Sequence, residues 1–450
     1  MDYEGRLGNV AVLGAAGKMG SGIVLLVSQE MADLSLKPEN RSKTFVLHAV
    51  DISHQALSGL MSYLREQVRK GAEKKIVALR AAYADRSDLV DNSEIIDAYV
   101  DRALDIVRPT TLIEAAAEAG AVFEAAPESL DLKLKLLAKC GGKGPKGPWV
   151  FTNTSSIPIC EIDEKAGLGG RVMGFHFYNP PAVQKLVELI RAKTTLAEVA
   201  AFAEALAKSL RKTVVPSHDI AGFIGNGHFM RDMLFGMAEA ERLSKEMPFT
   251  HAVYCVNKSS QDFLVRPMGI FQLVDYVGLE VCQCILKVMD PRLPGQGLKS
   301  ALLERFLGQG VKGGQNHDGS QKDGFLRYEK GRIAGVWEPE AKRYVPLSEL
   351  QVDCDKKLGP LPEPGLAWKS AVKHPAKDKA LAEFFCKLAG MKTLGAELAL
   401  RHGSRSKEVA LALVSDGVAA RAEDVNKVLL TGFFHAYGPV NDYFQVKVAK

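Results

Sequence analysis

Two ionisable residues interrupt a pair of apolar segments in the stretch RVMGFHFYNPPAVQKLVELI, residues 171–190. The segments at 172–178 and 186–190 have the length and composition of buried strands, and they carry His176 and Glu188 respectively. Burying a polar group costs free energy unless it is paired, so neighbouring strands would place the two side chains together. A carboxylate that orients an imidazole makes a general base. The alternative is a histidine at a strand end and an unrelated glutamate on an exposed face.

A group of glycines follows the first predicted strand, residues 9–13. The sequence GAAGKMGSGI places Gly14, Gly17 and Gly20 between this strand and a helical segment. In a strand–turn–helix unit, such glycines allow a tight turn, the approach of a pyrophosphate and close packing of helix on strand. The spacing is one residue wider at its front than G-x-G-x-x-G. We therefore expect a nucleotide-binding turn with an altered path; the alternative is a purely structural turn.

An acidic residue, Asp51, stands at the end of the second predicted strand, residues 44–50, and follows Gly20 by 31 residues. An acid in this position hydrogen-bonds the ribose of NAD and disfavours the additional phosphate of NADP. The usual interval is about 20 residues, and we attribute the excess to an insertion at 36–43. NAD is therefore the expected cofactor. The alternative is that Asp51 caps the following helix.

Polar residues also follow two further predicted strands, at 121–126 and 149–153. Open parallel sheets bind their ligands at the carboxyl ends of the strands. The residues in question are Glu124, Glu128 and Lys133 at and after the end of the first strand, and Asn153 and Ser155 of the sequence NTSS at and after the end of the second. The amide and hydroxyl groups of NTSS can reach a substrate oxygen, or they can cap the next helix.

The remaining chain is mostly helical in pattern. Residues 52–108 are rich in charge, which is typical of a projecting helical hairpin. One basic face of it would consist of Arg65, Arg69, Lys70, Lys74 and Lys75. This face is compatible with solvent or with contacts to a phosphate. Beyond residue 219 the pattern is again helical, with a small hairpin at 332–348 and a Pro- and Gly-rich linker at 357–365.

The composition is that of a globular protein of two or three domains, with 450 residues that are 47% hydrophobic and 25% charged. A net charge of +5 without a long Lys/Arg block gives no reason to expect a nucleic-acid partner. Seven cysteines without framework spacing indicate free thiols. The sequence has no leader pattern and no apolar stretch of about 18 residues, which predicts a cytoplasmic protein that does not span a membrane.

Several motifs together resemble the NAD-dependent L-3-hydroxyacyl-CoA dehydrogenase family. They occur in family order across residues 7–330, as GKMGSGI, VFEAAPESLDLK, FTNTSSIPI, GFHFYNPPAVQKLVELI, DIAGFIGNGHFM and RPMGIFQLVDYVGLE. Besides the widened glycine turn, Ala221 replaces a proline of the family pattern and Gly227 replaces an arginine. The resemblance implies reversible oxidation of an L-3-hydroxyacyl-CoA to the 3-ketoacyl-CoA, as in fatty-acid β-oxidation or short-chain acyl-CoA metabolism.

The resemblance also implies roles for individual residues. His176 would be the catalytic base and Glu188 its orienting carboxylate. Ser155 would contact the substrate hydroxyl and the nicotinamide, and Asn226 would line the same site. The residues expected at the cofactor are Gly14, Gly17, Gly20, Asp51, Glu128, Lys133, Asn153 and Asn179. No metal is expected.

The expected architecture is an α/β Rossmann-like dinucleotide-binding domain followed by all-α C-terminal regions. The domains would span residues 1–216, 217–350 and 366–450, and the third faintly echoes the second. An acyl-CoA is the expected substrate, and a homodimer is compatible with the pattern. Two other functions are left open, namely a relative that binds NAD without turnover and a dehydrogenase of a free 3-hydroxy acid.

Overall fold

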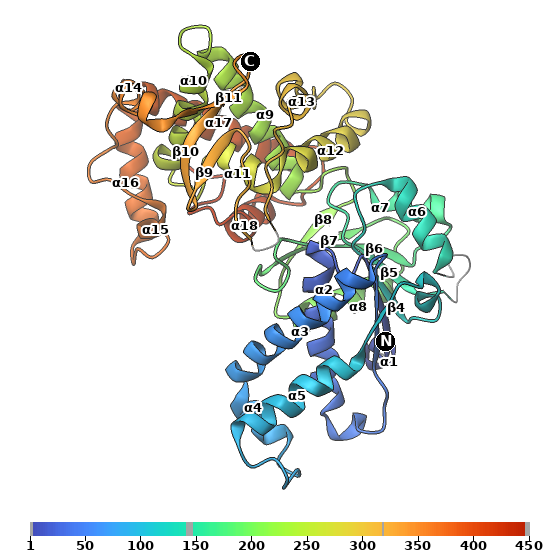
Figure 1. Cartoon of the computed structure of the whole chain (residues 1–450). Coiled ribbons are helices and arrows are strands. Elements are labelled where there is room, and N and C mark those ends of the chain that lie inside the picture. The colour runs from blue at the N-terminus through green and yellow to red at the C-terminus, as the bar shows by residue number, and fades with distance from the viewer. Residues whose placement is uncertain (1–2, 141–146, 317–318, 446–450) are drawn as a thin grey trace. The chain divides into compact units, whose positions relative to one another are not determined.

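A computed structural model describes residues 3–140, 147–316 and 319–445, and it divides the chain into two compact units (Figure 1). The units are Met1–Ile220 and Ala221–Lys450. The start of the predicted first domain and the end of the predicted third domain lie outside the described residues.

The first unit is built on a mostly parallel sheet that has eight strands among the described residues. The strands are β1 (Asn9–Leu13), β2 (Val46–Val50), β3 (Val107–Thr110), β4 (Ala121–Glu124), β5 (Trp149–Thr152), β6 (Val172–Phe177), β7 (Leu186–Arg191) and β8 (Thr213–His218). Their order is β3-β2-β1-β4-β5-β6-β7-β8. The strands from β3 to β6 in this order are mutually parallel, β7 is antiparallel to β6, and β8 is parallel to β7. The order changes direction at β1, which confirms the predicted Rossmann-like fold.

Strand β1 shows why the central strands are apolar throughout. Val10 and Val12 belong to the core on one face of the sheet, whereas Ala11 and Leu13 belong to a core on the other. Helices cover both faces of the sheet, so polar residues at every second position of a strand would be buried. The helices of this unit are α1 (Tyr3–Leu7), α2 (Lys18–Ser35), η1 (Pro38–Asn40), α3 (His54–Lys74), α4 (Ile76–Ala82), α5 (Asn92–Ile106), η2 (Ile113–Ala116), α6 (Leu130–Lys139), α7 (Ile159–Ala166) and α8 (Ala197–Ser209).

Helices α3, α4 and α5 form an arm that projects from the sheet, as predicted for residues 52–108 (Figure 1). Four of the five basic side chains predicted for this face pair with carboxylates: Arg65 with Asp101, Arg69 with Asp97, Lys70 with Glu66 and Lys75 with Asp33. These pairs are largely exposed and neutralise the basic face locally. They favour the interpretation of a solvated face over a phosphate site.

The second unit is mainly helical. Its helices are α9 (Gly225–Leu243), α10 (Phe249–Lys258), η3 (Ser259–Phe263), α11 (Ile270–Val277), α12 (Leu279–Met289), η4 (Asp290–Arg292), α13 (Ala301–Gly308), η5 (Leu347–Glu349), α14 (Gln351–Leu358), α15 (Trp368–Ala371), α16 (Lys377–Ala389), α17 (Leu394–Ser415) and α18 (Ala422–Gly432). The unit begins at Ala221 rather than at 217, because β8 continues the sheet of the first unit to His218.

A continuous hydrophobic core joins the described residues of this unit from Ala221 to Phe444. Helix α9 packs against α17 within it. The ring of Phe263 fills the space beside Gly395, where a Cβ would lie 2.3 Å from the ring. The segments expected as separate domains at 217–350 and 366–450 are therefore parts of one compact unit.

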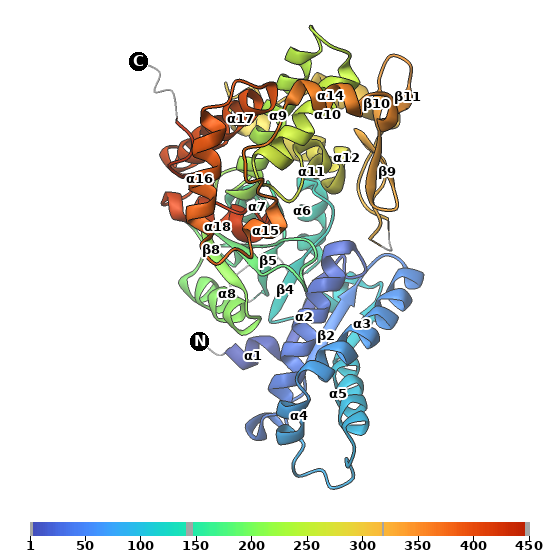
Figure 2. The same ribbon diagram turned by 90° about the vertical axis from the view of Figure 1, so that its left-hand side faces the viewer.

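An antiparallel sheet accompanies the helices of the second unit (Figure 2). Its described strands are β9 (Leu326–Glu329), β10 (Arg332–Glu338) and β11 (Arg343–Pro346). The hairpin predicted at 332–348 is confirmed as β10 and β11. The second unit therefore contains a small sheet in addition to its helices. Asp275 on α11 fastens this sheet by accepting the N–H groups of Phe325 and Leu326 at 2.7 and 2.9 Å. No helix among the described residues of either unit is long and apolar enough to cross a membrane.

Candidate active site

The glycine turn after β1 brings Gly14 and Gly20 into contact. Gly14 has φ +74°, and the N–H groups of Gly14 and Ala15 donate to the carbonyl of Val50 at 2.9 and 3.0 Å. A Cβ on Gly20 would lie 2.0 Å from the Gly14 oxygen, so α2 can begin against β1 only with glycine there. Gly17 immediately precedes α2. The turn thus places a helix N-terminus, which attracts phosphate, at the end of β1.

Asp51 binds the backbone of the widened turn. Its Oδ2 accepts the N–H of Ala16 at 2.9 Å, and its Oδ1 accepts the N–H of Ile52 at 2.8 Å. The cap of the next helix is Ser53, whose Oγ accepts the N–H of Ala56 at 3.2 Å. The alternative interpretation of Asp51 as a helix cap is therefore wrong. Asp51 instead joins the ends of β1 and β2, where the ribose of a dinucleotide lies in this class of fold.

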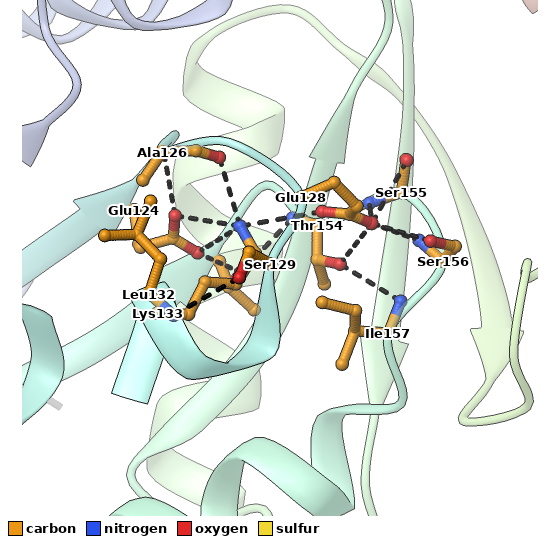
Figure 3. Close-up of polar contacts among 11 residues, drawn as sticks. Glu124, Ala126, Glu128, Ser129, Leu132, Lys133, Thr154, Ser155, Ser156 and Ile157 are labelled. Atoms are coloured by element: carbon orange, nitrogen blue, oxygen red, sulfur yellow. Dashed lines mark hydrogen bonds and ion pairs between the residues drawn. The ribbon is translucent and has the colours of Figure 1, made fainter. Parts of the chain in front are cut away.

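A buried ion pair lies at the ends of β4 and β5 (Figure 3). Lys133 Nζ is 2.9 Å from both carboxylate oxygens of Glu124 and 3.2 Å from the carbonyl oxygen of Ala126. Thr152 donates its hydroxyl to Glu124 at 2.6 Å. Burial lowers the pKa of Lys133, but the charges of Glu124 and Glu128 outweigh burial and raise it. Lys133 therefore remains charged and anchors the connection between β4 and α6.

Glu128 lies between this ion pair and the turn after β5 (Figure 3). Its Oε1 accepts the hydroxyl groups of Thr154 and Ser156 at 2.7 Å each, and the N–H groups of Ser155 and Ser156 at 2.9 Å each. Its Oε2 is 3.6 Å from Lys133 Nζ. Burial raises the pKa of Glu128, but the charge of Lys133 and these hydrogen bonds outweigh burial and hold it below its usual value. An ionised Glu128 thus fixes the turn that carries Ser155.

The two asparagines predicted at the cofactor have different environments. Asn153 Oδ1 accepts the N–H of Phe177 at 2.8 Å and so joins the ends of β5 and β6. Asn179 lies in the loop after β6, and its Oδ1 is buried without a hydrogen-bond partner among the described residues. Buried polar atoms in native proteins are nearly always hydrogen-bonded. This oxygen therefore fits a contact with a bound molecule.

His176 and Glu188 lie opposite one another on β6 and β7. They are partners in the antiparallel register, and His176 Nδ1 is 3.3 Å from Glu188 Oε1. The adjacent residues Phe175 and Phe177 belong to the core on one face of the sheet, so the pair points to the other face. Glu188 is fully buried, and His176 is 7% exposed. The two interrupted strands thus bring their polar side chains together, as the sequence predicts.

Two functional candidates, one beside this pair and one at the loop that joins its strands, carry no signal in the sequence pattern. Tyr178 donates its hydroxyl at 2.6 Å to Glu188 Oε1, the oxygen that also faces the imidazole. Lys212, just before β8, donates its ammonium group to the carbonyl oxygens of Pro181 and Gln184, in the loop between β6 and β7. Burial lowers the pKa of Lys212 to about 8. A tyrosine after an apolar strand is typical of packing, and a lysine before a strand is typical of a surface, so only the fold reveals their partners.

Asn226 lies on α9 in the second unit, whereas the other predicted site residues lie in the first. The neighbouring Gly227, which replaces an arginine of the family pattern, has a structural explanation. A Cβ at this position would lie 3.0 Å from Leu413 on α17. The glycine therefore allows α17 to pack closely against α9.

These features together define a class of protein. The glycine turn at the switch point of a parallel sheet, with an acid after the second strand, is typical of a dinucleotide-binding protein. The buried His–Glu pair adds a group that can transfer protons. This combination is that of a nicotinamide-dependent dehydrogenase.

Comparison with models of protein families shows which family of dehydrogenases the chain belongs to. Residues 9–220 match the model for the 3-hydroxyacyl-CoA dehydrogenase, NAD binding domain, and residues 256–323 match the model for the 3-hydroxyacyl-CoA dehydrogenase, C-terminal domain. The chain therefore belongs to the 3-hydroxyacyl-CoA dehydrogenase family of NAD-dependent enzymes.

Individual relatives agree with this assignment. A probable 3-hydroxybutyryl-CoA dehydrogenase of Bacillus subtilis is 27% identical over 330 residues, which cover 71% of this chain and 97% of the relative. The 3-hydroxyadipyl-CoA dehydrogenase of Escherichia coli is 33% identical over 210 residues, which cover 47% of this chain and 43% of that protein. A crystal structure of 3-hydroxybutyryl-CoA dehydrogenase from Escherichia coli matches 96% of this chain and 90% of its own, with a TM-score of 0.63 at 22% identity. The similarity to this crystal structure shows a shared fold.

Proposed function

We propose that this enzyme reversibly oxidises an L-3-hydroxyacyl-CoA to the 3-ketoacyl-CoA with NAD, and that His176 and Glu188 form its acid–base pair. The contact between His176 Nδ1 and Glu188 Oε1 carries the proposal. Cofactor binding alone would not require a buried imidazole beside a buried carboxylate, because each of these groups costs free energy to bury.

His176 acts in its neutral form during oxidation. The imidazole takes the proton of the substrate hydroxyl, and in the reverse direction the imidazolium returns a proton to the carbonyl oxygen. Glu188 stabilises the imidazolium and favours the tautomer with hydrogen on Nδ1. Nε2 is then the nitrogen that exchanges the proton with the substrate.

The residues present fit NAD. Gly14, Gly17 and Gly20 form a turn that leaves room for a pyrophosphate at the N-terminus of α2. Asp51 offers a carboxylate to the ribose and disfavours the phosphate of NADP. The buried Oδ1 of Asn179 has no hydrogen-bond partner among the described residues, and a bound molecule can supply a donor to it. When bound, NAD supplies the acceptor for the hydride that leaves the hydroxyl-bearing carbon.

The other predicted residues have supporting roles in this proposal. A contact of Ser155 with the substrate stays a prediction, and so does the role of Asn226. Glu128 and Lys133 fix the turn that carries Ser155 through their hydrogen bonds and charges. Direct contacts of Glu128, Lys133 and Asn153 with the cofactor stay predictions, as do a homodimer and a cytoplasmic location.

The test is oxidation of NADH with acetoacetyl-CoA by the wild type and by His176→Gln. Loss of the positioned acid–base group should lower turnover by about 10²–10⁴-fold, while NADH binding is nearly kept. His374→Gln, which changes an exposed histidine of the second unit, is the matched control and should keep wild-type turnover. Near-normal turnover by a folded His176→Gln protein would show that His176 is not the catalytic base.

Two other outcomes would contradict the proposed reaction and indicate a different function. Tight NADH binding without turnover by the wild type would indicate a binding protein. Faster turnover of free acetoacetate than of its CoA thioester would indicate a dehydrogenase of a free 3-hydroxy acid. A comparison of short, medium and long 3-ketoacyl-CoA substrates then gives the preferred chain length.

A further inference from the structure

The carboxylate of Glu188 is shared between two side chains. Its Oε1 accepts the hydroxyl of Tyr178 at 2.6 Å and faces His176 Nδ1 at 3.3 Å. The rings of Tyr178 and His176 are themselves neighbours, with centroids 4.9 Å apart. Hydrogen bonds to an ionised acceptor shorten as they strengthen. The phenol therefore makes the stronger of the two hydrogen bonds to this oxygen.

We propose that Tyr178 sets how strongly Glu188 stabilises a proton on His176, which makes it a positioning residue of the acid–base pair. This inference rests on the proposed function of that pair. A phenol that donates to a carboxylate neutralises part of its charge, so less of that charge stabilises the neighbouring imidazolium. Tyr178 therefore favours the neutral imidazole, which is the form that accepts the hydroxyl proton.

The phenol is a permanent donor in this arrangement. Burial, and after it the charge of Glu188, raise the pKa of Tyr178 well above its ordinary value. The loop that follows Tyr178 is held in turn by Lys212, through the carbonyl oxygens of Pro181 and Gln184. The hydroxyl of Tyr178 thus keeps its proton and its place next to the carboxylate.

Several ionisable groups on the elements around the two strands have partners of their own, and His218 on β8 lies beside Arg191 at the far end of β7. These contacts are Glu128 with Ser156, Lys133 with Glu124, Asp163 with the N–H of Gly170, Arg171 with the carbonyl of Pro148, Arg191 with the carbonyl of Thr195, Lys212 with the carbonyl of Gln184, and Asp219 with the N–H of Cys160. None of these contacts involves Tyr178. A change in the titration of the imidazole would therefore report on the phenol.

The test compares the wild type with Tyr178→Phe by NMR titration of the His176 imidazole, whose signal is assigned by its loss in His176→Gln. Without the phenol, the imidazole should titrate at a pH higher by about 0.5–1 unit, because Glu188 then stabilises the imidazolium more strongly. The low-pH limb of kcat/KM for oxidation of L-3-hydroxybutyryl-CoA should move in the same direction. At a pH below this limb, kcat/KM should fall about 3- to 10-fold relative to the wild type.

A double variant decides whether the effect passes through the carboxylate. In a Glu188→Gln background, Tyr178→Phe should no longer shift the titration. Tyr344→Phe is the matched control, because it removes a phenol hydrogen bond of 2.8 Å to the carbonyl of Gly324 in the second unit. This control should leave the titration and the pH profile unchanged.

The outcomes separate this inference from the proposed function. An unchanged or lower titration pH in folded Tyr178→Phe overturns the inference. A uniform loss of kcat/KM at every pH also overturns it, because that pattern indicates a purely structural role. If the wild type turns over no CoA substrate, the proposed function fails, while the NMR titration still decides whether Tyr178 acts on the imidazole.

Discussion

Gly20 lies so close to Gly14 that a Cβ added to Gly20 would come within 2.0 Å of the Gly14 carbonyl oxygen. The two backbones meet where α2 begins at the end of β1. This approach fixes the position of the helix N-terminus, even though the turn before it is one residue wider than the usual spacing. The widened turn therefore keeps the contact between its first glycine, Gly14, and its last glycine, Gly20.

Gly20→Ala should weaken NADH binding on the order of 10-fold, because its methyl group forces α2 away from β1. Overpacking of this kind costs about 1–3 kcal/mol, and about 1.4 kcal/mol corresponds to tenfold in affinity. Fluorescence titration with NADH measures the change. Gly59→Ala on α3 is the control, since a Cβ there would meet nothing within 4 Å. Wild-type affinity in Gly20→Ala would show that this turn does not hold the cofactor.

Asp51→Ala should change both the affinity and the choice of cofactor. NADH affinity should fall by about 10-fold, because the ribose loses its acceptor and the N–H of Ala16 loses its partner. NADPH affinity should fall much less, because the carboxylate that disfavours the additional phosphate is gone. The ratio of the two Kd values is the measurement, and Asp88→Ala in the exposed arm is the control. An unchanged ratio would place cofactor selection on other residues.

The sheet and the His–Glu pair are predictable from the sequence for one physical reason. Strands covered on both faces must be apolar, so a polar residue inside such a run requires a partner. The strands that escape prediction, β3 and β8, are the two edges of the sheet. Each contains a proline, Pro109 or Pro216, which an edge strand tolerates because one of its sides makes no ladder hydrogen bonds.

The features that sequence patterns do not reveal depend on contacts between distant segments. Tyr178 meets Glu188 across a loop, and Lys212 meets Pro181 at a separation of 31 residues. The shared core of the second unit depends on contacts such as that of Phe263 with Gly395. A glycine inside a helix or a lysine at a strand end has no local pattern that identifies its partner.

Glu128→Gln should change how stability depends on pH in acid. Burial raises the pKa of Glu128, but the charge of Lys133 and the hydrogen bonds from Ser156 and Thr154 outweigh burial and place it below the usual 4.5. The folded state therefore binds fewer protons than the unfolded state. Its stabilisation is fully present above pH 4.5 and is lost as pH falls through the folded pKa.

Urea unfolding at several pH values measures this effect. The wild type should lose stability more steeply in acid than Glu128→Gln, which should already be less stable at neutral pH. Glu329→Gln, which changes an exposed glutamate of β9, is the control and should follow the wild type. Equal acid slopes in the wild type and in Glu128→Gln would contradict a charged Glu128 in the folded state.

Lys212→Met should lower turnover more than it lowers NADH affinity. The ammonium group of Lys212 holds the carbonyl oxygens of Pro181 and Gln184, in the loop that joins the strands of the acid–base pair. Pro181 in turn packs on α2, since a Cβ at Gly22 would lie 2.8 Å from its ring. Loosening this loop should misplace the pair and lower kcat on the order of 10-fold. Lys208→Met, which changes an exposed lysine of α8, is the control, and an equal loss of kcat and NADH affinity in Lys212→Met would argue against a positioning role.

The pH dependence of stability gives Lys212 a second, independent test. Burial lowers its pKa from 10.5 to about 8, so between these values the unfolded state binds more protons than the folded state. The free energy of unfolding of the wild type should therefore rise with pH from about 8 to 10.5 through this residue. Lys212→Met should lack that increment in urea unfolding, whereas Lys208→Met should retain it. The same rise in Lys212→Met as in the wild type would mean that the ammonium group is not buried by the loop.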